Sequence, residues 1–583
     1  MHAGREYAAP RTPLEERLAH IWQEVLGLAK VGVKDNFFDL GGHSLRATVL
    51  VSRIHKELNV NLPLKDVFRF ATIEQMAQRL GEVEEQAYSA IPQAEEREVY
   101  PVSSAQKRLY ILHQLEGAEQ SYNMPGAMLL EGAVERERFE EAFRKLIARH
   151  ETLRTGFEIA DGEPVQRIYP QVEFAVEHLQ AGEEEAADKV REFIRAFDLK
   201  KPPLLRVGLI ELAKDRHILL FDMHHIISDG VSTDVLVEEF VRLYSGEEPP
   251  PLRIQYKDYA VWQQSPAQKE RLKRQEAYWL EQFRGESPVL EMPTDYARPA
   301  VQKYDGHTLQ FRLDSAVSEG LKRIAAENGA TLYMVLLAAY TVLLQKYTGQ
   351  EDVIVGTPIA GRTHSDLQPV IGMFVNTLAL RSYPSGKKTF LSYLEEIKET
   401  MLGAYEHQDY PFEELVEKLQ VTRDLSRSPL FDTMFSLQNI ENKEFALDGL
   451  QITPYPSDYG MSKFDLSLDV TEGGDGLECS LEYATALFKR ETVERLAKHL
   501  EQLITAIVNE PGAKIASLSL LTAEEQEQIQ HGFNPVCSRV SAGEAVPSAV
   551  RGAGGADAGC GGSHVQRQAT HLPRAERARQ PFG

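Results

Sequence analysis

Hydrophobic positions in the first 81 residues follow the period of an α-helix. After Thr12 and Pro13, which suit the start of a helix, apolar residues recur every three or four positions: Leu14, Leu18, Ile21, Trp22 and Val25. Further helices are predicted from Ser44, over Leu64–Phe68 and over Thr72–Leu80. This part of the chain is therefore predicted to be a small helical unit, followed by a polar, glutamate-rich linker over residues 82–98.

The next part of the chain mixes two periods. Short β-rich runs are predicted at Arg206–Ile210, His217–Met223, Val353–Thr357 and Phe464–Val470. Helical patterns cover Arg138–Arg149, Ser232–Tyr244, Thr331–Tyr347 and Glu491–Asn509. Because about 430 residues exceed one compact domain, we expect two α/β lobes, one over 99–268 and one over 269–533.

The last 50 residues, 534–583, differ from the rest. They contain six arginines, no lysine and two of the three cysteines, and they show no hydrophobic period. We predict that this tail is disordered. The abrupt change in basic residues also suggests a non-native or frame-shifted segment, and a natural linker is the alternative.

Composition narrows the function classes. The net charge of −23 argues against nonspecific nucleic-acid binding. Three cysteines among 583 residues exclude a disulfide scaffold, and none are paired at metal-ligand spacing, so no metal is expected. Met1 to Pro10 lacks the apolar core of a signal peptide, and the apolar run Leu332–Leu344 is shorter than the roughly 20 residues that span a bilayer. We expect a cytoplasmic multidomain protein that binds no membrane.

Ser44 stands where a loop passes into a helix, after Gly41, Gly42 and His43. Two glycines allow a tight turn that exposes the hydroxyl. From the residues alone, a helix-capping serine is the ordinary interpretation. The alternative is a phosphate-ester attachment point, which a helix N-terminus favours. The hydrolase pattern G-x-S-x-G is not present.

The run Asp35–Leu45 closely resembles the peptidyl carrier domains of nonribosomal peptide synthetases, over residues 12–81. The resemblance implies a four-helix bundle that carries 4′-phosphopantetheine on Ser44, whose thiol holds an aminoacyl or peptidyl thioester. It also implies a phosphopantetheinyl transferase and an upstream adenylation domain as partners. Leu45 and Phe68 could form a partner-facing surface or belong to the core.

A second candidate site is the pair His224 and His225, at the end of a predicted buried strand. Side chains alternate along a strand, so the two rings should face opposite sides. Histidine is a plausible proton acceptor near neutral pH, and Asp229 is near enough to orient a ring. From these residues alone, a buried structural pair is the more common arrangement. A metal site is less favoured because adjacent rings diverge.

The run His224–Gly230 matches the HHxxxDG signature of condensation domains, in the chloramphenicol acetyltransferase-like superfamily. Six further segments match this family's motifs in its order: Ser104–Tyr110, Arg149–Thr155, Tyr256–Trp262, Ile371–Thr377, His407–Glu413 and Arg423–Leu430. The resemblance implies two such lobes arranged as a V, with His225 in a tunnel between them. Donor and acceptor carriers would approach from opposite faces, and the chain is expected to be monomeric.

The resemblance implies peptide-bond formation by attack of an acceptor amine on a donor thioester. His225 is either a general base or a group that positions the amine, and the backbone near Gly230 is a further candidate for stabilising the oxyanion. We expect Asp229 to be structural and to pair with Arg362, with Arg154 as the competing partner. No P-loop is present, which agrees with a step that needs no ATP.

Two other functions stay open from the sequence. Epimerisation domains share the histidine pair, although Gly230 is followed here by Val-Ser-Thr rather than their usual residues. An inactive scaffold that only docks carriers is the second. Within condensation, Met223–Gly230 resembles the subtype that accepts an L-configured donor, and the sequence as a whole resembles tyrocidine- and gramicidin-type synthetases.

Overall fold

The computed structural model describes residues 7–115, 118–421, 424–438, 449–455 and 459–532. The predictions for the tail after residue 533 therefore lie outside the described residues. Two compact units are present, Met1–Thr522 and Ala523–Gly583. In the second, the described part is a short helix, α16 (Ala523–Glu527), followed by one π-helical turn, η5 (Gln528–Gly532).

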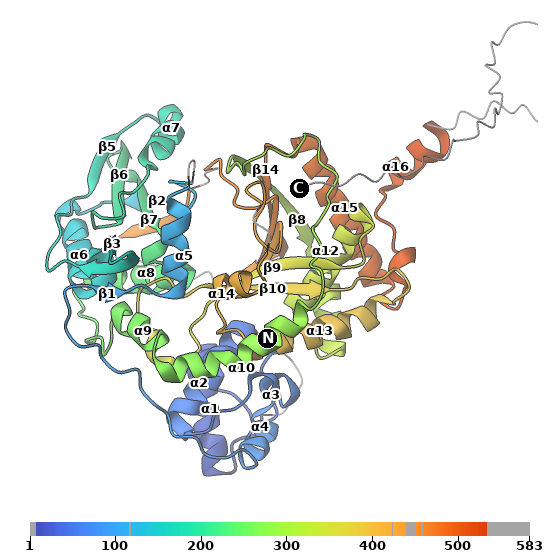
Figure 1. The fold of residues 1–583 in the computed structure, drawn as a ribbon, viewed down its shortest axis with the longest axis horizontal. Helices are drawn as coiled ribbons and strands as arrows, with labels where there is room; N and C mark the ends of the chain where they lie inside the picture. Colours follow the sequence, from blue (N-terminus) through green and yellow to red (C-terminus); the bar gives the residue numbers. More distant parts are fainter. Residues whose placement is uncertain (1–6, 116–117, 422–423, 439–448, 456–458, 533–583) are drawn as a thin grey trace, which may run out of the picture. The chain divides into compact units, whose positions relative to one another are not determined.

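The N-terminal helices are confirmed. They are α1 (Pro13–Leu26), α2 (Ser44–Leu58), α3 (Leu64–Arg69) and α4 (Ile73–Leu80), drawn in blue in Figure 1. Thr12 caps α1 and Thr72 caps α4, each accepting a backbone N–H bond. Their apolar faces meet around the fully buried Trp22, whose ring contacts Phe37 edge-on at 5.0 Å.

The first α/β region contains a five-stranded sheet in the order β12-β2-β7-β6-β5. Its strands are β2 (Asn123–Gly132), β5 (Glu177–Gln180), β6 (Leu205–Ala213), β7 (Arg216–His224) and β12 (Leu450–Pro454). A smaller sheet holds β1 (Tyr100–Pro101), β4 (Glu163–Ile168) and β3 (Thr155–Ala160). The helices of this region are α5 (Ser104–His113), α6 (Arg136–Arg149), α7 (Glu183–Phe193) and α8 (Gly230–Tyr244), with the 3-10 turns η1 (Glu151–Arg154) and η2 (His225–Ile227).

The second α/β region is built on a six-stranded sheet in the order β10-β9-β11-β13-β14-β8. Its strands are β8 (Gly306–Asp314), β9 (Val353–Ile359), β10 (Asn376–Ser382), β11 (Thr433–Gln438), β13 (Leu466–Gly473) and β14 (Gly476–Ala484). Its helices and turns are α11 (Ser315–Glu327), α12 (Leu332–Thr348), η3 (Ser365–Leu367), α13 (Phe390–Glu406), α14 (Phe412–Lys418), α15 (Arg490–Asn509) and η4 (Ile515–Ser517). The connection from the first region runs through α9 (Tyr256–Gln263) and α10 (Pro266–Gln282).

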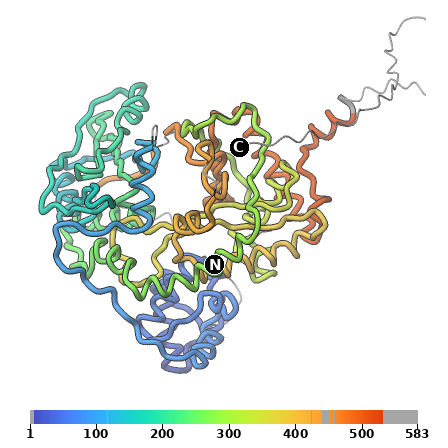
Figure 2. The backbone as a smooth tube through the Cα atoms, in the orientation of Figure 1, coloured from blue at the N-terminus to red at the C-terminus, as the bar shows by residue number. Residues whose placement is uncertain are grey.

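One strand crosses between the two regions. Strand β12 comes late in the chain, yet it pairs antiparallel with β2 of the first sheet, with Leu450 opposite Gly132. The next strand in the chain, β13, belongs to the six-stranded sheet, and orange backbone is accordingly present in both regions in Figure 2. The expected division into lobes over 99–268 and 269–533 therefore leaves out that β12, from the second range, completes the sheet of the first region.

Several element boundaries differ from the sequence prediction by a few residues, and the differences at α8 and β13 have identifiable physical reasons. Helix α8 begins at Gly230 rather than Ser232, because the carboxylate of Asp229 caps it by accepting the Ser232 N–H at 2.7 Å. Strand β13 begins at Leu466, since the residues before it still belong to the crossover. Within the described ranges, no single helix has the length and apolar character to cross a membrane; α11 and α12, bent by 108°, meet that criterion only as a pair.

Candidate functional sites

Ser44 is the first residue of α2, and the turn before it depends on glycine. Gly41 has a φ of 90°, and a Cβ added to Gly42 would lie 2.3 Å from the Phe37 ring. The chain can therefore approach the aromatic core only where no side chain intervenes. The preceding residue, His43, holds the capping position, so the Ser44 hydroxyl is not the helix cap considered from the sequence.

The surroundings of Ser44 fit a phosphate ester. Helix α2 has 15 residues, and no side chain caps its N-terminus, which leaves its first backbone N–H groups available to an anion. The Ser44 hydroxyl interacts with the phenol of Tyr405, near the end of α13. These residues are compatible with 4′-phosphopantetheine attached through the Ser44 oxygen.

The helical unit contacts the rest of the first compact unit beside Ser44. The ammonium of Lys65 lies 3.0 Å from the Glu406 carboxylate, and the hydroxyls of Ser52 and Ser365 are 2.8 Å apart. A separate cleft of about 50 Å³ lies within the α/β regions. It is lined by residues of α5, α9, α10, β10, α14 and neighbouring loops, among them Tyr259, Trp262, Asn376 and Gln408.

His225 is held by one ring nitrogen only. It begins the 3-10 turn after β7, and its Nδ1 lies 2.8 Å from the carbonyl oxygen of Ser228. Because a carbonyl can only accept, Nδ1 carries the hydrogen and Nε2 keeps its lone pair. Burial, and then the positive charge of Lys463, lower the pKa of His225 to about 4. The ring is therefore neutral at pH 7, with an acceptor nitrogen at a partly exposed position.

His224 is buried and engaged at both ring nitrogens. Its Nδ1 accepts the Ile226 N–H at 3.1 Å, and its Nε2 lies 3.3 Å from Nδ1 of His113. Burial lowers the pKa of His224 well below its ordinary value. The two rings thus contact different groups, as expected for neighbouring residues at a strand end, and His224 supports the turn that presents His225.

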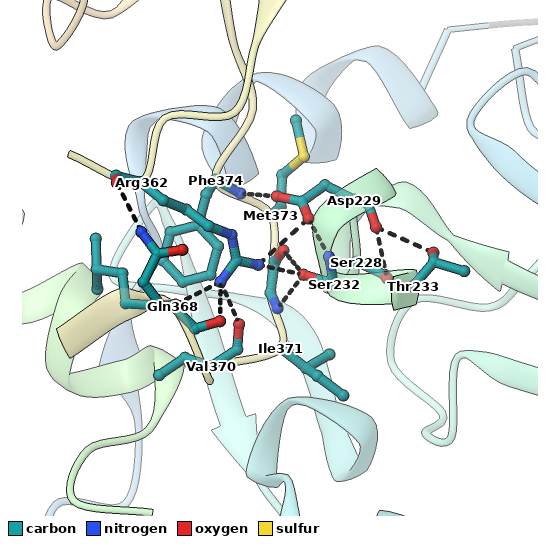
Figure 3. Close-up of polar contacts among 12 residues, drawn as sticks. Ser228, Asp229, Ser232, Thr233, Arg362, Gln368, Val370, Ile371, Met373 and Phe374 are labelled. Carbon is teal, nitrogen blue, oxygen red and sulfur yellow. Dashed lines mark hydrogen bonds and ion pairs between the residues drawn. The ribbon is translucent and has the colours of Figure 1, made fainter. Parts of the chain in front are cut away.

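Asp229 is fully buried, and Figure 3 shows how both of its carboxylate oxygens are used. Oδ1 accepts the Ser232 N–H at 2.7 Å and faces Nη2 of Arg362 at 3.3 Å. Oδ2 accepts the N–H of Phe374 at 2.9 Å. This carboxylate therefore connects the start of α8 to the loop before β10.

Arg362 is 2% exposed and is the ion-pair partner expected for Asp229. Its guanidinium stacks on the Phe374 ring at 4.2 Å and donates to the Val370 carbonyl at 2.7 Å and the Ser232 hydroxyl at 2.7 Å (Figure 3). The competing partner, Arg154, donates instead to the carbonyl oxygen of Tyr169.

Hydrogen bonds join four of the other sequence motifs to one another or to the run His224–Gly230. Gln106 donates to the carbonyl oxygen of Ile226 at 3.2 Å, and Thr152 donates to that of Ile371 at 2.9 Å. Asn376 donates to the carbonyl oxygens of Gln408 and Tyr410 at 2.9 and 2.8 Å. Segments far apart in the sequence are thus joined at the boundary between the two sheets.

Several residues of the site were not found by sequence reasoning. Tyr122 accepts the backbone N–H of His225 at 2.8 Å, and Lys463 places its ammonium 5.2 Å from the centre of the Tyr122 ring. His113 contacts His224, and Ser232 contacts Arg362. None of these residues belongs to a motif with a recognisable spacing, because each reaches the site through tertiary packing. The only sequence signal was the position of Lys463 immediately before a predicted strand.

Comparison with known proteins identifies the fold and the carrier. The family model for the condensation domain matches residues 96–530, and the model for the phosphopantetheine attachment site matches residues 16–80. The chain belongs to the condensation-domain family of nonribosomal peptide synthetases and carries a phosphopantetheine-binding carrier domain before it. The resemblance drawn from Asp35–Leu45 and His224–Gly230 is thereby confirmed.

The relatives are long synthetases. Gramicidin S synthase 2 of Brevibacillus brevis is 51% identical over 533 residues, which are 91% of this chain and 12% of that protein. Tyrocidine synthase 3 of Brevibacillus parabrevis is 50% identical over 531 residues, 91% of this chain and 8% of the relative. The chain therefore spans about a tenth of the length of these curated relatives.

Solved structures share the fold of the condensation domain. The X-domain from teicoplanin biosynthesis superposes with a TM-score of 0.70 at 28% identity, over 74% of this chain and 100% of that one. The condensation domain from the Monacolin K polyketide synthase gives 0.67 at 21% identity, over 72% and 99%. The chloramphenicol acetyltransferase-like fold is confirmed, and neither epimerisation nor a passive scaffold is favoured by these similarities.

Proposed function

We propose that this chain forms a peptide bond between a donor residue carried on Ser44 and the amine of an amino acid on a downstream carrier. The observation that carries the proposal is the neutral ring of His225, whose Nδ1 is fixed by Ser228 and whose Nε2 has no hydrogen-bond partner among the described residues. We assign residues 1–81 to the carrier, 82–98 to the linker, and 99–268 and 269–533 to the two lobes. An upstream adenylation domain and a phosphopantetheinyl transferase complete the proposed set of partners.

The prosthetic group supplies a thiol that carries the aminoacyl group as a thioester. Ser44 provides the oxygen for its attachment, and its interaction with Tyr405, near the end of α13, supports this role. His225 accepts a hydrogen bond from the attacking amine through Nε2, which directs the nitrogen lone pair at the carbonyl carbon. With a pKa of about 4, His225 is better suited to orient the amine than to retain its proton.

The other residues hold this arrangement. His224 supports the turn through Ile226 and His113, and Asp229 with Arg362 joins α8 to the loop before β10. Gly230, the first residue of α8, is exposed, and a Cβ there would meet no atom within 4 Å. Its backbone N–H is therefore a candidate for donating a hydrogen bond to the oxyanion that develops on the thioester carbonyl. We propose an L-configured donor residue for the site.

The test is intact-mass analysis in two steps. Phosphopantetheinyl transferase and coenzyme A should add the prosthetic group to the wild-type chain and not to Ser44→Ala, while Ser52→Ala serves as the matched serine control on the same helix. After donor loading, a separate aminoacyl carrier is added as acceptor. The proposal expects the donor mass to move to the acceptor as a dipeptide; a loaded wild-type chain that transfers nothing would overturn it, and a chiral analysis of the donor alone would reveal epimerisation.

A further inference from the structure

Lys463 lies on the crossover that joins β12 to β13, and its backbone is fixed. Its N–H donates to the Glu482 carboxylate at 3.4 Å, and its carbonyl oxygen accepts the Gln302 amide at 2.8 Å. The preceding N–H, of Ser462, donates to the carbonyl oxygen of Tyr304 at 2.7 Å. The direction in which the Lys463 side chain leaves the backbone is therefore set by three hydrogen bonds to two neighbouring segments, β14 and the residues before β8.

The ammonium of Lys463 reaches the environment of His225. It lies over the ring of Tyr122, 5.2 Å from the ring centre, and the carbonyl oxygen of Tyr122 accepts the His225 N–H at 2.8 Å. Among the described residues, no carboxylate forms an ion pair with this ammonium, although Glu482 and Asp469 attract it electrostatically. A cation over an aromatic face, without a carboxylate partner, is poised to bind a ligand oxygen.

Electrostatics agree with this placement. Burial lowers the pKa of Lys463, with a smaller lowering from Arg108, so the site does not stabilise the charge by itself. The positive charge of Lys463 lowers the pKa values of both His225 and His224. A half-buried cation whose surroundings disfavour both its own charge and that of the neighbouring ring costs folding free energy, which is typical of functional sites.

We propose that the Lys463 ammonium binds the donor carbonyl oxygen opposite His225 and stabilises the negative charge that develops there. This inference rests on the proposed function. The amine nitrogen forms a bond to the thioester carbon while the carbonyl π electrons move to oxygen, where Lys463 faces them. The carbonyl then re-forms as the carbon–sulfur bond breaks. The proton lost by the amine balances the thiolate, so the products are an amide and a thiol.

Three variants separate this role from a structural one. Lys463→Met keeps the length and removes the charge, and Lys463→Arg keeps the charge. The control, Lys322→Met, removes a lysine of α11 that pairs at 2.9 Å with Glu472 of β13, the strand that follows Lys463 in the chain. The substrates are an aminoacyl N-acetylcysteamine thioester as donor and a loaded acceptor carrier. For Lys463→Met we expect a loss of about 10²–10³-fold in single-turnover rate, as for removal of one oxyanion donor. Lys463→Arg should retain part of the rate, and Lys322→Met all of it.

Two readouts do not depend on turnover. The unfolding midpoint of Lys463→Met should equal or exceed that of the wild type, because the variant removes a half-buried charge that has no ion-pair partner among the described residues. Titration of ¹³C-labelled histidine should show the pKa of His225 rising from about 4. The other groups that act on this ring, His224 and Asp229, are unchanged in the variant; Arg108, which acts on Lys463, is unchanged as well.

The outcomes distinguish this inference from the function on which it rests. A Lys463→Met chain with the full rate, or one whose lost rate follows a lowered unfolding midpoint, overturns the role of Lys463 while the wild-type activity stands. An unchanged pKa of His225 in Lys463→Met likewise overturns it. A wild-type chain that forms no peptide with either donor overturns the proposed function first.

Discussion

Two polar clusters, one around Asp229 and Arg362 and the other around His225 and Lys463, differ in how many of their polar groups form hydrogen bonds or ion pairs. Their central residues, Asp229 and His225, are only four positions apart in the sequence. In the first, both carboxylate oxygens of Asp229 accept hydrogen bonds, and Arg362 donates to Ser232 and to backbone carbonyls as well. In the second, His225 uses one nitrogen only, and Lys463 has no carboxylate in ion-pair contact among the described residues.

This difference suggests that the first cluster stabilises the fold and that the second takes part in the reaction. A buried ion pair contributes to stability when its remaining hydrogen-bonding capacity is also used. This holds for both carboxylate oxygens of Asp229, although Nε of Arg362 has no hydrogen-bond partner among the described residues. The cluster fixes the positions of α8 and the loop before β10. A group with an unused acceptor or an unpaired charge has capacity left for a substrate. The first cluster should therefore determine stability, and the second should determine rate.

The largest expected loss of stability comes from Arg362→Met. Removing the guanidinium leaves Asp229 as a buried charge without its partner, which should lower the free energy of unfolding by about 3–5 kcal/mol. Chemical denaturation measures it. Arg242→Met is the control, since Arg242 pairs with Glu238 on the exposed face of α8 at 3.0 Å and should change stability by less than about 0.5 kcal/mol. Equal stability of the two variants would contradict a structural role for Arg362.

A smaller loss is expected for Asp229→Asn. The amide keeps the shape of the side chain but replaces one accepting oxygen with an NH₂ group, which then faces hydrogen-bond donors. The free energy of unfolding should therefore fall by about 1.5–3 kcal/mol, the range for hydrogen bonds to charged groups. In the double variant with Arg362→Met, the two losses should not add, because the pair acts as one unit. Additive losses, or an Asp229→Asn chain with normal stability and rate, would show that the ion pair has no role.

The smallest effect is a pH dependence that belongs to the second cluster. In the unfolded chain a histidine takes up a proton below about pH 6.5, whereas His225 in the folded chain does so only near pH 4. The unfolded state therefore binds more protons in this window, and stability should fall as the pH decreases from about 6.5 toward 4, by about 1–2 kcal/mol at pH 5. Denaturation at both pH values measures it.

His225→Gln is the control for that dependence. It should remove the contribution of His225 to the slope and leave those of His224 and His113, whose pKa values burial also lowers. A slope unchanged in His225→Gln would mean that His225 is not a neutral buried ring. Between about pH 7 and pH 6 His225 keeps its neutral form, so a fall in the condensation rate there should follow only the protonation of the acceptor amine, whose ordinary pKa is about 7.7–8.0.

Much of the fold could be predicted from local pattern. Helices such as α1 and α4 have both an apolar period and a threonine cap, so their starts are defined within a few residues. The crossover of β12 could not be predicted, because a five-residue strand has no local signal for which sheet it joins. Its pairing with β2 depends on contacts more than 300 residues apart in the sequence.

The candidate site divides in the same way. Ser44, His225 and Asp229 belong to contiguous motifs, and the resemblance also supplied Arg362 as a partner. Lys463 and Tyr122 have no such motif; their relation to His225 depends on a backbone bond and a ring contact between separate elements. Residues that act through tertiary placement become visible only when the fold is known.

The most direct measurement is the single-turnover rate of peptide-bond formation by His225→Ala beside its free energy of unfolding. The donor is loaded on Ser44 and the acceptor on a separate carrier. We expect the rate to fall by about 10²–10⁴-fold, the usual contribution of a positioned acid–base group, with the unfolding free energy within about 1 kcal/mol of the wild type. A His225→Ala chain that folds normally and keeps the full rate would contradict the assignment of chemistry to this cluster.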